Sequence, residues 1–368
     1  MRIGIDATPL VGNQRGCGIH RYLSGLLDSM QKLEPSHEFY LYANKDFEFP
    51  ASRPRWHKRI SWAPSLHMWT QFVLPRLACS DRLDVLWGPC QTLPLRLGGK
   101  IKTVLTLHDL FFLECPETLP FSARWIFRAL IPLSVRRAHR IIAVSETTGQ
   151  SLIRRLGVDP NKVKVIKEGI SPDLTPLPVK SAQEYLFNRY GIKAPFLLTV
   201  GTLEPRKNLI TALRCLKILQ NKYDWKGRLI IVGRSGWGMK NPKESAKELG
   251  INPDDIGVPG FVPQQDLAQF YSAAEAFLFP SLMEGFGLPL VEAMACHLPV
   301  ICANTGACPE VVEEGGILLP PLAAEAFAQA VWRLHTDGPH RASLIQRGHQ
   351  QAIKFNWNQA ARETLMVF

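Results

Sequence analysis

Residues 280–301, PSLMEGFGLPLVEAMACHLPVI, carry two carboxylates around a glycine-rich turn. The apolar run 276–279 predicts a strand before the turn, and Pro289 suits the first turn of a helix after it. The free N–H groups and positive dipole end of such a helix suit a phosphate. Glu284 and Glu292 are acceptors suited to the hydroxyl groups of a sugar or a ribose. Each glutamate taken alone would be an ordinary surface charge.

The segment GTLEPRKN at residues 201–208 places two cations before a predicted helix. The apolar run 196–200 predicts a strand in front of it, and the spacing of apolar residues predicts a helix over 209–219. A helix N-terminus favours acids over bases, so Arg206 and Lys207 indicate an anionic partner. A solvated charge pair is the alternative.

The N-terminal half opens with the same pattern of strand, loop and helix. A strand at residues 2–6 precedes a loop that ends at Gly18, and a helical pattern runs over 19–33. In an α/β domain this order forms a ligand-binding turn at the carboxyl end of a strand, although a plain tight turn fits equally well. His108 follows a predicted strand at 102–107, where its side chain would face the ligand crevice. A structural histidine bonded to backbone is the alternative.

The segment EGFGLPLVEAMA resembles the signature of retaining GT-B glycosyltransferases of the family 4 type, the mannosyltransferase-like group 1 transferases. The resemblance covers essentially the whole chain and is densest over 196–312. It implies an α/β protein with the GT-B fold, in which two Rossmann-like domains flank a deep interdomain cleft. It also implies transfer of a hexose, with mannose favoured, from a nucleotide-diphosphate sugar to a lipid-linked oligosaccharide or polysaccharide acceptor. GDP-mannose is the favoured donor, and no cofactor is expected.

The resemblance also implies roles for individual residues. Glu284 would contact the donor sugar beside His108, Glu292 would hold the ribose, and Arg206 and Lys207 would bind the diphosphate. The implied catalytic residues are His108, Glu284, Arg206 and Lys207. The implied donor-binding residues are Gly18, Arg206, Lys207, Val262, Glu284, Gly285, Phe286, Gly287, Leu288 and Glu292.

Two positions depart from the family pattern. Thr202 stands where many relatives have an arginine directly after the glycine of the strand, so Arg206 would carry more of the charge or the diphosphate contact would be weaker. Cys17 replaces the usual small residue of the first glycine loop, so only Gly18 is carried over from that loop.

Composition limits the possible partners. The chain has 368 residues, which suits two domains, and a formal net charge of +11, which favours anionic partners. Nucleotide phosphates or an acidic membrane fit this charge, and no nucleic acid is expected beside the transferase motifs. No two aspartates are spaced as Asp-x-Asp and the eight cysteines are scattered, so no metal site is predicted and transfer is expected to be metal-independent.

The chain is expected in the cytoplasm. No apolar run reaches the length of a membrane span, and a strand rather than a signal peptide is predicted at residues 2–6. Peripheral attachment to the inner face of the cytoplasmic membrane is the sharper alternative. Basic residues at 53–59 and 124–140 and an apolar helical pattern at 65–78 would form the contacting surface. The alternative interpretation is that the same segments are ordinary helices that pack on the core and expose their charges to solvent.

Prolines 172, 176 and 178 mark a domain boundary. The first domain is predicted at 1–174 and the second at 175–355. The resemblance implies that the first domain faces the acceptor, with a final helix at 356–368 packing back on it, and that the second binds the donor. Two other functions stay open: a nucleotide-sugar epimerase or hydrolase on the same fold, and a non-enzymatic binder of anionic membranes or nucleic acid. The non-enzymatic binder leaves the two motifs unexplained.

Overall fold

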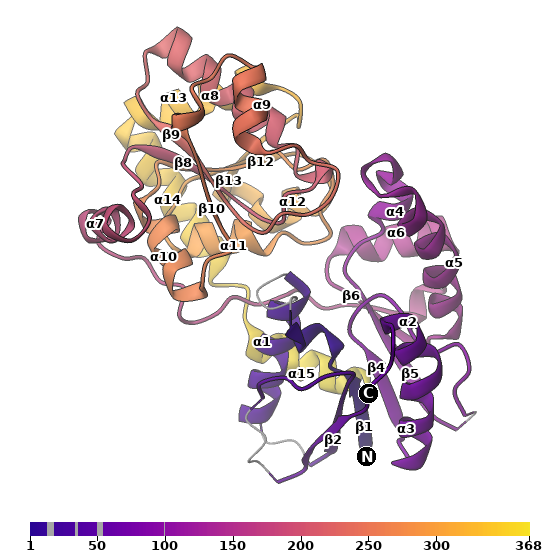
Figure 1. Cartoon of the computed structure of the whole chain (residues 1–368). Coiled ribbons are helices and arrows are strands. Elements are labelled where there is room, and N and C mark those ends of the chain that lie inside the picture. The colour runs from indigo at the N-terminus through magenta and orange to yellow at the C-terminus, as the bar shows by residue number, and fades with distance from the viewer. Residues whose placement is uncertain (13–17, 34–35, 50–53, 99) are drawn as a thin grey trace. The chain divides into compact units, whose positions relative to one another are not determined.

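The computed structural model describes residues 1–12, 18–33, 36–49, 54–98 and 100–368, which form two compact units (Figure 1). Unit 1 comprises Met1–Leu113, Phe121–Gly169 and Asn356–Phe368, and unit 2 comprises Glu114–Pro120 and Ile170–Phe355. The chain therefore changes unit after Gly169, whereas the sequence placed the boundary after residue 174.

Residues 114–120 lie in unit 2, although the sequence assigned them to the first domain. One contact explains this placement. The indole N–H of Trp237 donates a hydrogen bond of 2.7 Å to the carbonyl oxygen of Thr118, which is 119 residues away along the chain.

Unit 1 is built on a parallel sheet of seven strands in the order β3-β2-β1-β4-β5-β6-β7. Buried apolar side chains dominate its central strands, as expected where helices cover both faces of a parallel sheet. The strands are β1 (Arg2–Asp6), β2 (Glu38–Ala43), β3 (Trp56–Ile60), β4 (Val85–Gly88), β5 (Lys102–Leu107), β6 (Arg140–Ala143) and β7 (Val163–Val165).

Helix α1 buries one face in unit 1. In α1 the buried positions recur at helical spacing, from Tyr22 to Met30. The final helix α15 packs alongside α1, as Figure 1 shows. The helices are α1 (Gly18–Lys32), α2 (Leu66–Met68), the π-helical turn η3 (Trp69–Val73), α3 (Leu74–Ser80), α4 (Phe111–Glu114), α5 (Phe121–Arg137), α6 (Glu146–Leu156) and α15 (Trp357–Val367), with short 3₁₀ turns at Thr8–Leu10 and Pro160–Lys162.

Residues 56–59 of the basic stretch noted at 53–59 lie in the edge strand β3, a strand that the sequence did not predict. The Lys58 ammonium pairs with Asp46 at 2.6 Å, and Arg59 pairs with Asp81 at 3.3 Å. Trp56 is buried and stacks on Phe39 with ring centroids 4.2 Å apart. Residues 50–53 lie outside the described residues. Lys58 and Arg59 thus have protein partners, and the membrane-contacting surface expected at this stretch stays a prediction.

Unit 2 holds a second parallel sheet, of six strands in the order β10-β9-β8-β11-β12-β13. The strands are β8 (Phe196–Val200), β9 (Arg228–Val232), β10 (Ile256–Gly260), β11 (Ala276–Phe279), β12 (Val300–Ala303) and β13 (Gly316–Leu319). The helices are α7 (Val179–Tyr190), α8 (Leu209–Tyr223), α9 (Pro242–Glu248), α10 (Gln264–Ala273), α11 (Leu288–Ala295), α12 (Cys308–Val312), α13 (Ala324–Thr336) and α14 (Gly338–Ala352). Short 3₁₀ turns lie at Pro116–Thr118, Pro205–Lys207, Pro253–Asp255 and Glu313–Gly315.

The order of the second sheet brings the two sequence motifs together. β8 and β11 are parallel neighbours, with Leu197 opposite Ala276 and Leu198 opposite Phe277. Their carboxyl ends therefore lie at the same edge of the sheet, so the loops that follow them are adjacent although some 80 residues separate them in the chain. Ligands of doubly wound sheets bind at such an edge.

Candidate functional site

Backbone hydrogen bonds join the loop after β8 to the loop after β11. The amide of Leu282 donates to the carbonyl of Arg206 at 2.8 Å. Asn208 follows in a left-handed conformation and donates through Nδ2 to the carbonyls of Pro280 and Pro321, at 2.9 and 2.7 Å. Arg206 and Lys207 lie in the 3₁₀ turn Pro205–Lys207 before α8 rather than in the helix itself. The turn holds both cations beside the second loop.

Arg206, Lys207 and Glu284 form one buried charge cluster. Arg206 Nη1 donates to Glu284 Oε2 at 2.9 Å and to the carbonyl of Met283 at 2.6 Å. Lys207 Nζ donates to Glu284 Oε1 at 2.6 Å. Each carboxylate oxygen thus accepts from a different cation, and the three residues that the sequence assigned to the reaction centre from unit 2 are in direct contact.

The charge state of Glu284 follows from its surroundings. Burial would raise its pKa, but the charges of Arg206 and Lys207 outweigh burial and lower the pKa to about 2. Glu284 is therefore an anion at neutral pH. Its oxygens retain lone pairs beyond those that the two cations use, and these can accept hydrogen bonds from hydroxyl groups.

Glu204 completes the cluster, a residue to which the sequence analysis gave no role. Its Oε1 accepts from both Nε and Nη2 of Arg206, at 3.0 and 2.6 Å, and its side chain is buried. This forked contact fixes the guanidinium plane and leaves Nη1 directed at Glu284. The two cations thereby face two carboxylates. The only signal in the sequence was an acid two positions before an arginine.

The second loop leads directly into α11. Gly287 stands before the helix with a φ of +99°, a conformation that L side chains rarely adopt, so a glycine is required there. Glu292 lies within α11, and its Oε2 accepts a hydrogen bond of 2.8 Å from the hydroxyl of Tyr271 on α10. Tyr271 was not predicted, because its partner is 21 residues away. The expected ribose-binding carboxylate is therefore held in place from a second helix.

The remaining donor-side predictions lie around these loops. Gly285 lies between Glu284 and Phe286, whose buried ring packs edge to face on Phe355 with centroids 5.5 Å apart. Leu288 is buried at the start of α11. Val262 is buried in the loop between β10, which ends at Gly260, and α10.

Two predicted residues belong to unit 1. His108 follows β5, and its buried ring contacts Glu168 Oε1 through Nδ1 at 3.3 Å and the carbonyl of Pro89 through Nε2 at 2.9 Å. Gly18 is the first residue of α1, and a Cβ added to it would meet no atom within 4 Å. One turn later in α1, Tyr22 packs edge to face on His108 with centroids 4.7 Å apart. The preceding loop residues 13–17, which include Cys17, lie outside the described residues.

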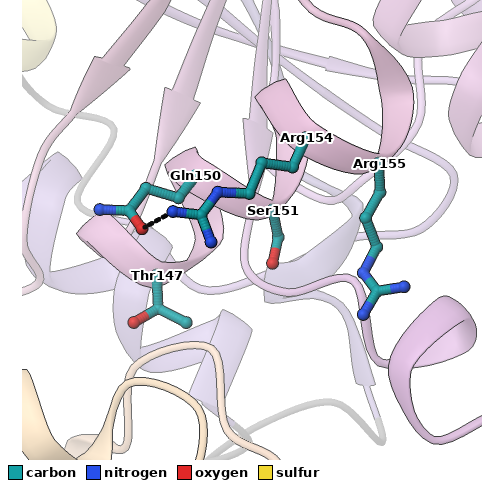
Figure 2. Close-up of a pocket in the computed structure, with 5 residues that line it drawn as sticks. All are labelled: Thr147, Gln150, Ser151, Arg154 and Arg155. Atoms are coloured by element: carbon teal, nitrogen blue, oxygen red, sulfur yellow. Dashed lines mark hydrogen bonds between the residues drawn. The ribbon is translucent and has the colours of Figure 1, made fainter.

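A pocket of about 270 Å³ lies on α6, lined by Thr147, Gln150, Ser151, Arg154 and Arg155 (Figure 2). Arg154 Nη2 donates to Gln150 Oε1 at 3.2 Å, and Arg155 extends from the neighbouring position of the helix. The first turn of α6 also touches the reaction-centre candidate of unit 1, because Thr148 Oγ1 donates to the carbonyl of His108 at 3.3 Å. The sequence analysis did not predict this pocket.

The described residues hold neither a candidate metal site nor a candidate membrane-spanning helix. No three His, Cys, Asp or Glu side chains among them are placed to hold a metal ion. No helix in residues 1–12, 18–33, 36–49, 54–98 and 100–368 is long and apolar enough to cross a bilayer.

Comparisons with known proteins identify the family. The family model described as Glycosyltransferase Family 4 matches residues 17–174, and the one described as Glycosyl transferases group 1 matches residues 183–351. The O-antigen chain mannosyltransferase B of Escherichia coli is 30% identical over 298 residues, which cover 79% of this chain and 76% of that protein.

Solved structures are similar over the full length. Sucrose-phosphate synthase from Thermosynechococcus elongatus has a TM-score of 0.78 at 21% identity, with coverage of 100% of this chain and 98% of that one. Anabaena HepE, in a complex with UDP-glucose, has a TM-score of 0.77 at 21% identity, with coverage of 100% and 99%. At these identities the structures show the fold. The chain belongs to the group 1 glycosyltransferases of family 4 and is a glycosyltransferase with the GT-B fold.

Proposed function

We propose that this enzyme is a retaining, metal-independent mannosyltransferase that uses GDP-mannose and a lipid-linked oligosaccharide or polysaccharide acceptor. The observation that carries the donor chemistry is the contact of Arg206 and Lys207 with Glu284 at adjacent strand ends, in front of α11. The likeness to a mannosyltransferase of O-antigen chains supports mannose and a polysaccharide acceptor. The retaining outcome rests on the family.

The cluster of Arg206, Lys207 and Glu284 can stabilise both charges that develop during glycosyl transfer. Negative charge grows on the leaving diphosphate, and Arg206, Lys207 and the N-terminus of α11 are preorganised donors for it. Positive charge grows on the sugar, and the ionised Glu284 can stabilise it while accepting from sugar hydroxyls. Glu292, held by Tyr271, would accept from the ribose.

The donor is tested by ligand-dependent thermal stability. A ligand that binds the folded chain raises its melting temperature, so we expect GDP-mannose to stabilise the enzyme more than UDP-glucose at equal concentration. UDP-glucose is the second candidate because HepE, which shares the fold, was solved with it. Stabilisation by UDP-glucose alone would overturn the proposed donor. An α-linked mannosyl product, identified by NMR, supports retention, and a β-linked product contradicts it.

Metal independence is tested with a chelator. The cations of the cluster can balance diphosphate charge, so we expect mannosyl transfer to proceed at the same rate in excess EDTA. A family member with a known Mg²⁺ requirement, assayed alongside, verifies that the chelator acts. Loss of activity that Mg²⁺ or Mn²⁺ restores would overturn the proposal. Release of free mannose without acceptor would instead favour the hydrolase alternative.

For membrane access to the acceptor, α5 offers a better surface than β3. Phe121 and Trp125 stand one turn apart on its outer face, 73% and 58% exposed, with their rings in edge contact at 6.2 Å. Arg128 and Arg136 are exposed on the same helix, and α5 contains no acidic residue. Aromatic rings flanked by arginines suit the interface of an anionic bilayer.

The surface on α5 is tested by vesicle sedimentation at low and high salt. We expect the enzyme to bind phosphatidylglycerol vesicles at low salt and to be released by high salt, since each arginine contributes about 1 kcal/mol there. A Phe121→Ser, Trp125→Ser variant should lose this binding. Phe187→Ser removes an exposed ring from α7 in unit 2 and should retain vesicle binding. Equal binding by both variants, or none by the wild type, would rule out this surface.

A further inference from the structure

His108 has an acceptor at each ring nitrogen. The carbonyl oxygen of Pro89 cannot donate a hydrogen bond, so Nε2, 2.9 Å from it, carries a proton. Nδ1 lies 3.3 Å from a carboxylate oxygen of Glu168, which accepts a second ring proton. This arrangement is satisfied by the imidazolium, which has N–H groups at both positions and no free lone pair.

The ion pair of His108 and Glu168 is buried, and neighbouring side chains pack against it. His108 and Glu168 are 9% and 4% exposed, so each charge depends on the other. Tyr22 packs against the imidazole ring from α1, and its hydroxyl lies 3.2 Å from Thr106 Oγ1. Thr148 of α6 holds the His108 carbonyl. The ring therefore has little freedom to turn.

The backbone next to Glu168 is held by the final helix. A Cβ added to Gly169 would lie 2.3 Å from the backbone nitrogen of Trp357, so only glycine allows this approach. Trp357 also packs its ring edge to face on Tyr22, with centroids 6.1 Å apart. The C-terminal helix thus braces both Glu168 and the ring that covers His108.

We propose that Glu168 is a positioning residue for glycosyl transfer, whose carboxylate holds His108 as a fixed, doubly protonated cation. This proposal rests on the proposed function and on the catalytic role that the family resemblance implies for His108. Both N–H groups of this imidazolium are used by Pro89 and Glu168, so it contributes positive charge and cannot remove a proton from the acceptor. The attacking hydroxyl must then lose its proton to another group, such as an oxygen of the departing diphosphate.

The groups that face His108 define its titration. They are Glu168, the adjacent Asp109, which accepts from Gln91, and the neutral Tyr22. Burial would lower the pKa of His108, and the Glu168 carboxylate outweighs burial so that the pKa is raised. Replacing the carboxylate by an amide leaves burial dominant, so the histidine becomes neutral at a lower pH than in the wild type.

Two measurements test this inference. In Glu168→Gln we expect kcat relative to the wild type to fall about tenfold or more at a pH of about 8 and to recover as the pH is lowered, because the imidazole then protonates without the carboxylate. Glu363→Gln, a carboxylate on α15 that accepts from Gln359, should keep the wild-type profile. A loss of kcat equal at all pH values means that Glu168 acts only structurally, and the proposal fails.

The second measurement does not use the Glu168→Gln variant. Nitrogen-15 histidine NMR of the wild type, assigned by the resonances missing in His108→Gln, should show both ring nitrogens protonated at a pH of about 8. A single protonated nitrogen at that pH overturns the inference. Because this readout uses no sugar nucleotide, a failure of the GDP-mannose assignment leaves it unaffected, and the two failures are distinguishable.

Discussion

At the scale of residues, Lys207 offers the sharpest test of the donor chemistry. Its ammonium lies 2.6 Å from Glu284 and 4.9 Å from the centroid of the Phe279 ring, so its position is fixed before a ligand arrives. Removing one preorganised donor to a transition-state charge costs about 10²-fold or more in rate. We expect that loss in kcat for Lys207→Ala at saturating donor. Lys222→Ala breaks an exposed pair with Glu325 on the same unit and should leave kcat unchanged. Similar rates for the two variants would exclude Lys207.

Glu284 makes stability depend on pH in a predictable direction. Its pKa is about 2 in the folded chain against an ordinary 4.5, so its contribution is complete above 4.5 and is lost as the pH falls toward 2. The difference corresponds to about 3 kcal/mol. We expect the urea-unfolding free energy of the wild type to fall over this window while that of Glu284→Gln changes less. Parallel curves for the two proteins would mean that the pKa is not lowered.

At the scale of elements, Trp357 is a main contact of α15 with unit 1. Trp357 packs on Tyr22 and against Gly25 and Gly169, where an added Cβ would lie 2.5 and 2.3 Å from its atoms. Deleting a buried tryptophan ring costs about 3–5 kcal/mol. We expect Trp357→Ala to lose that much in urea unfolding, and Trp62→Ala, 72% exposed, to change stability by about 0.5 kcal/mol or less. Equal effects would show that α15 is not anchored through this ring.

The elements also show what could be predicted from sequence. The strands at 2–6, 102–107, 196–200 and 276–279 were predicted within their observed bounds, because buried strands of a parallel sheet are nearly continuous apolar runs. β3 was missed because it is an edge strand whose lysine and arginine pair with aspartates elsewhere in the chain. A distant partner of this kind leaves no periodic pattern in the sequence.

The same limit applies to the candidate site. The sequence identified Glu284, Arg206 and Lys207 because the two motifs are long, and the structure adds that they touch. Glu168 and Tyr271 were missed because each is defined by a contact with a residue 60 or 21 positions away. Contacts between polar groups of different elements depend on the order of the strands in the sheet. That order cannot be read from a single sequence.

At the scale of the whole molecule, the chain leaves unit 1 after Gly169 and returns at Asn356. The two ends of the long segment of unit 2 meet there, since the amide of Ile170 donates to the carbonyl of Phe355 at 3.3 Å. Unit 2 is thus an insertion whose entry and exit are neighbours, the arrangement that tolerates excision and circular permutation.

It follows that residues 170–355 can be expressed as an autonomous module. This polypeptide lacks residues 114–120 and so loses the hydrogen bond from Trp237 to Thr118. The loss lowers the free energy of unfolding by about 1 kcal/mol, which is small beside the stability expected of a domain with a six-stranded sheet. We expect it to unfold cooperatively and to bind GDP while transferring no sugar, as calorimetry and activity assays would report. A circularly permuted module with its new termini in the loop after β11, between Glu284 and α11, should not bind nucleotide. The cut would separate Glu284 from that helix. Such a module would let nucleotide binding be engineered apart from unit 1.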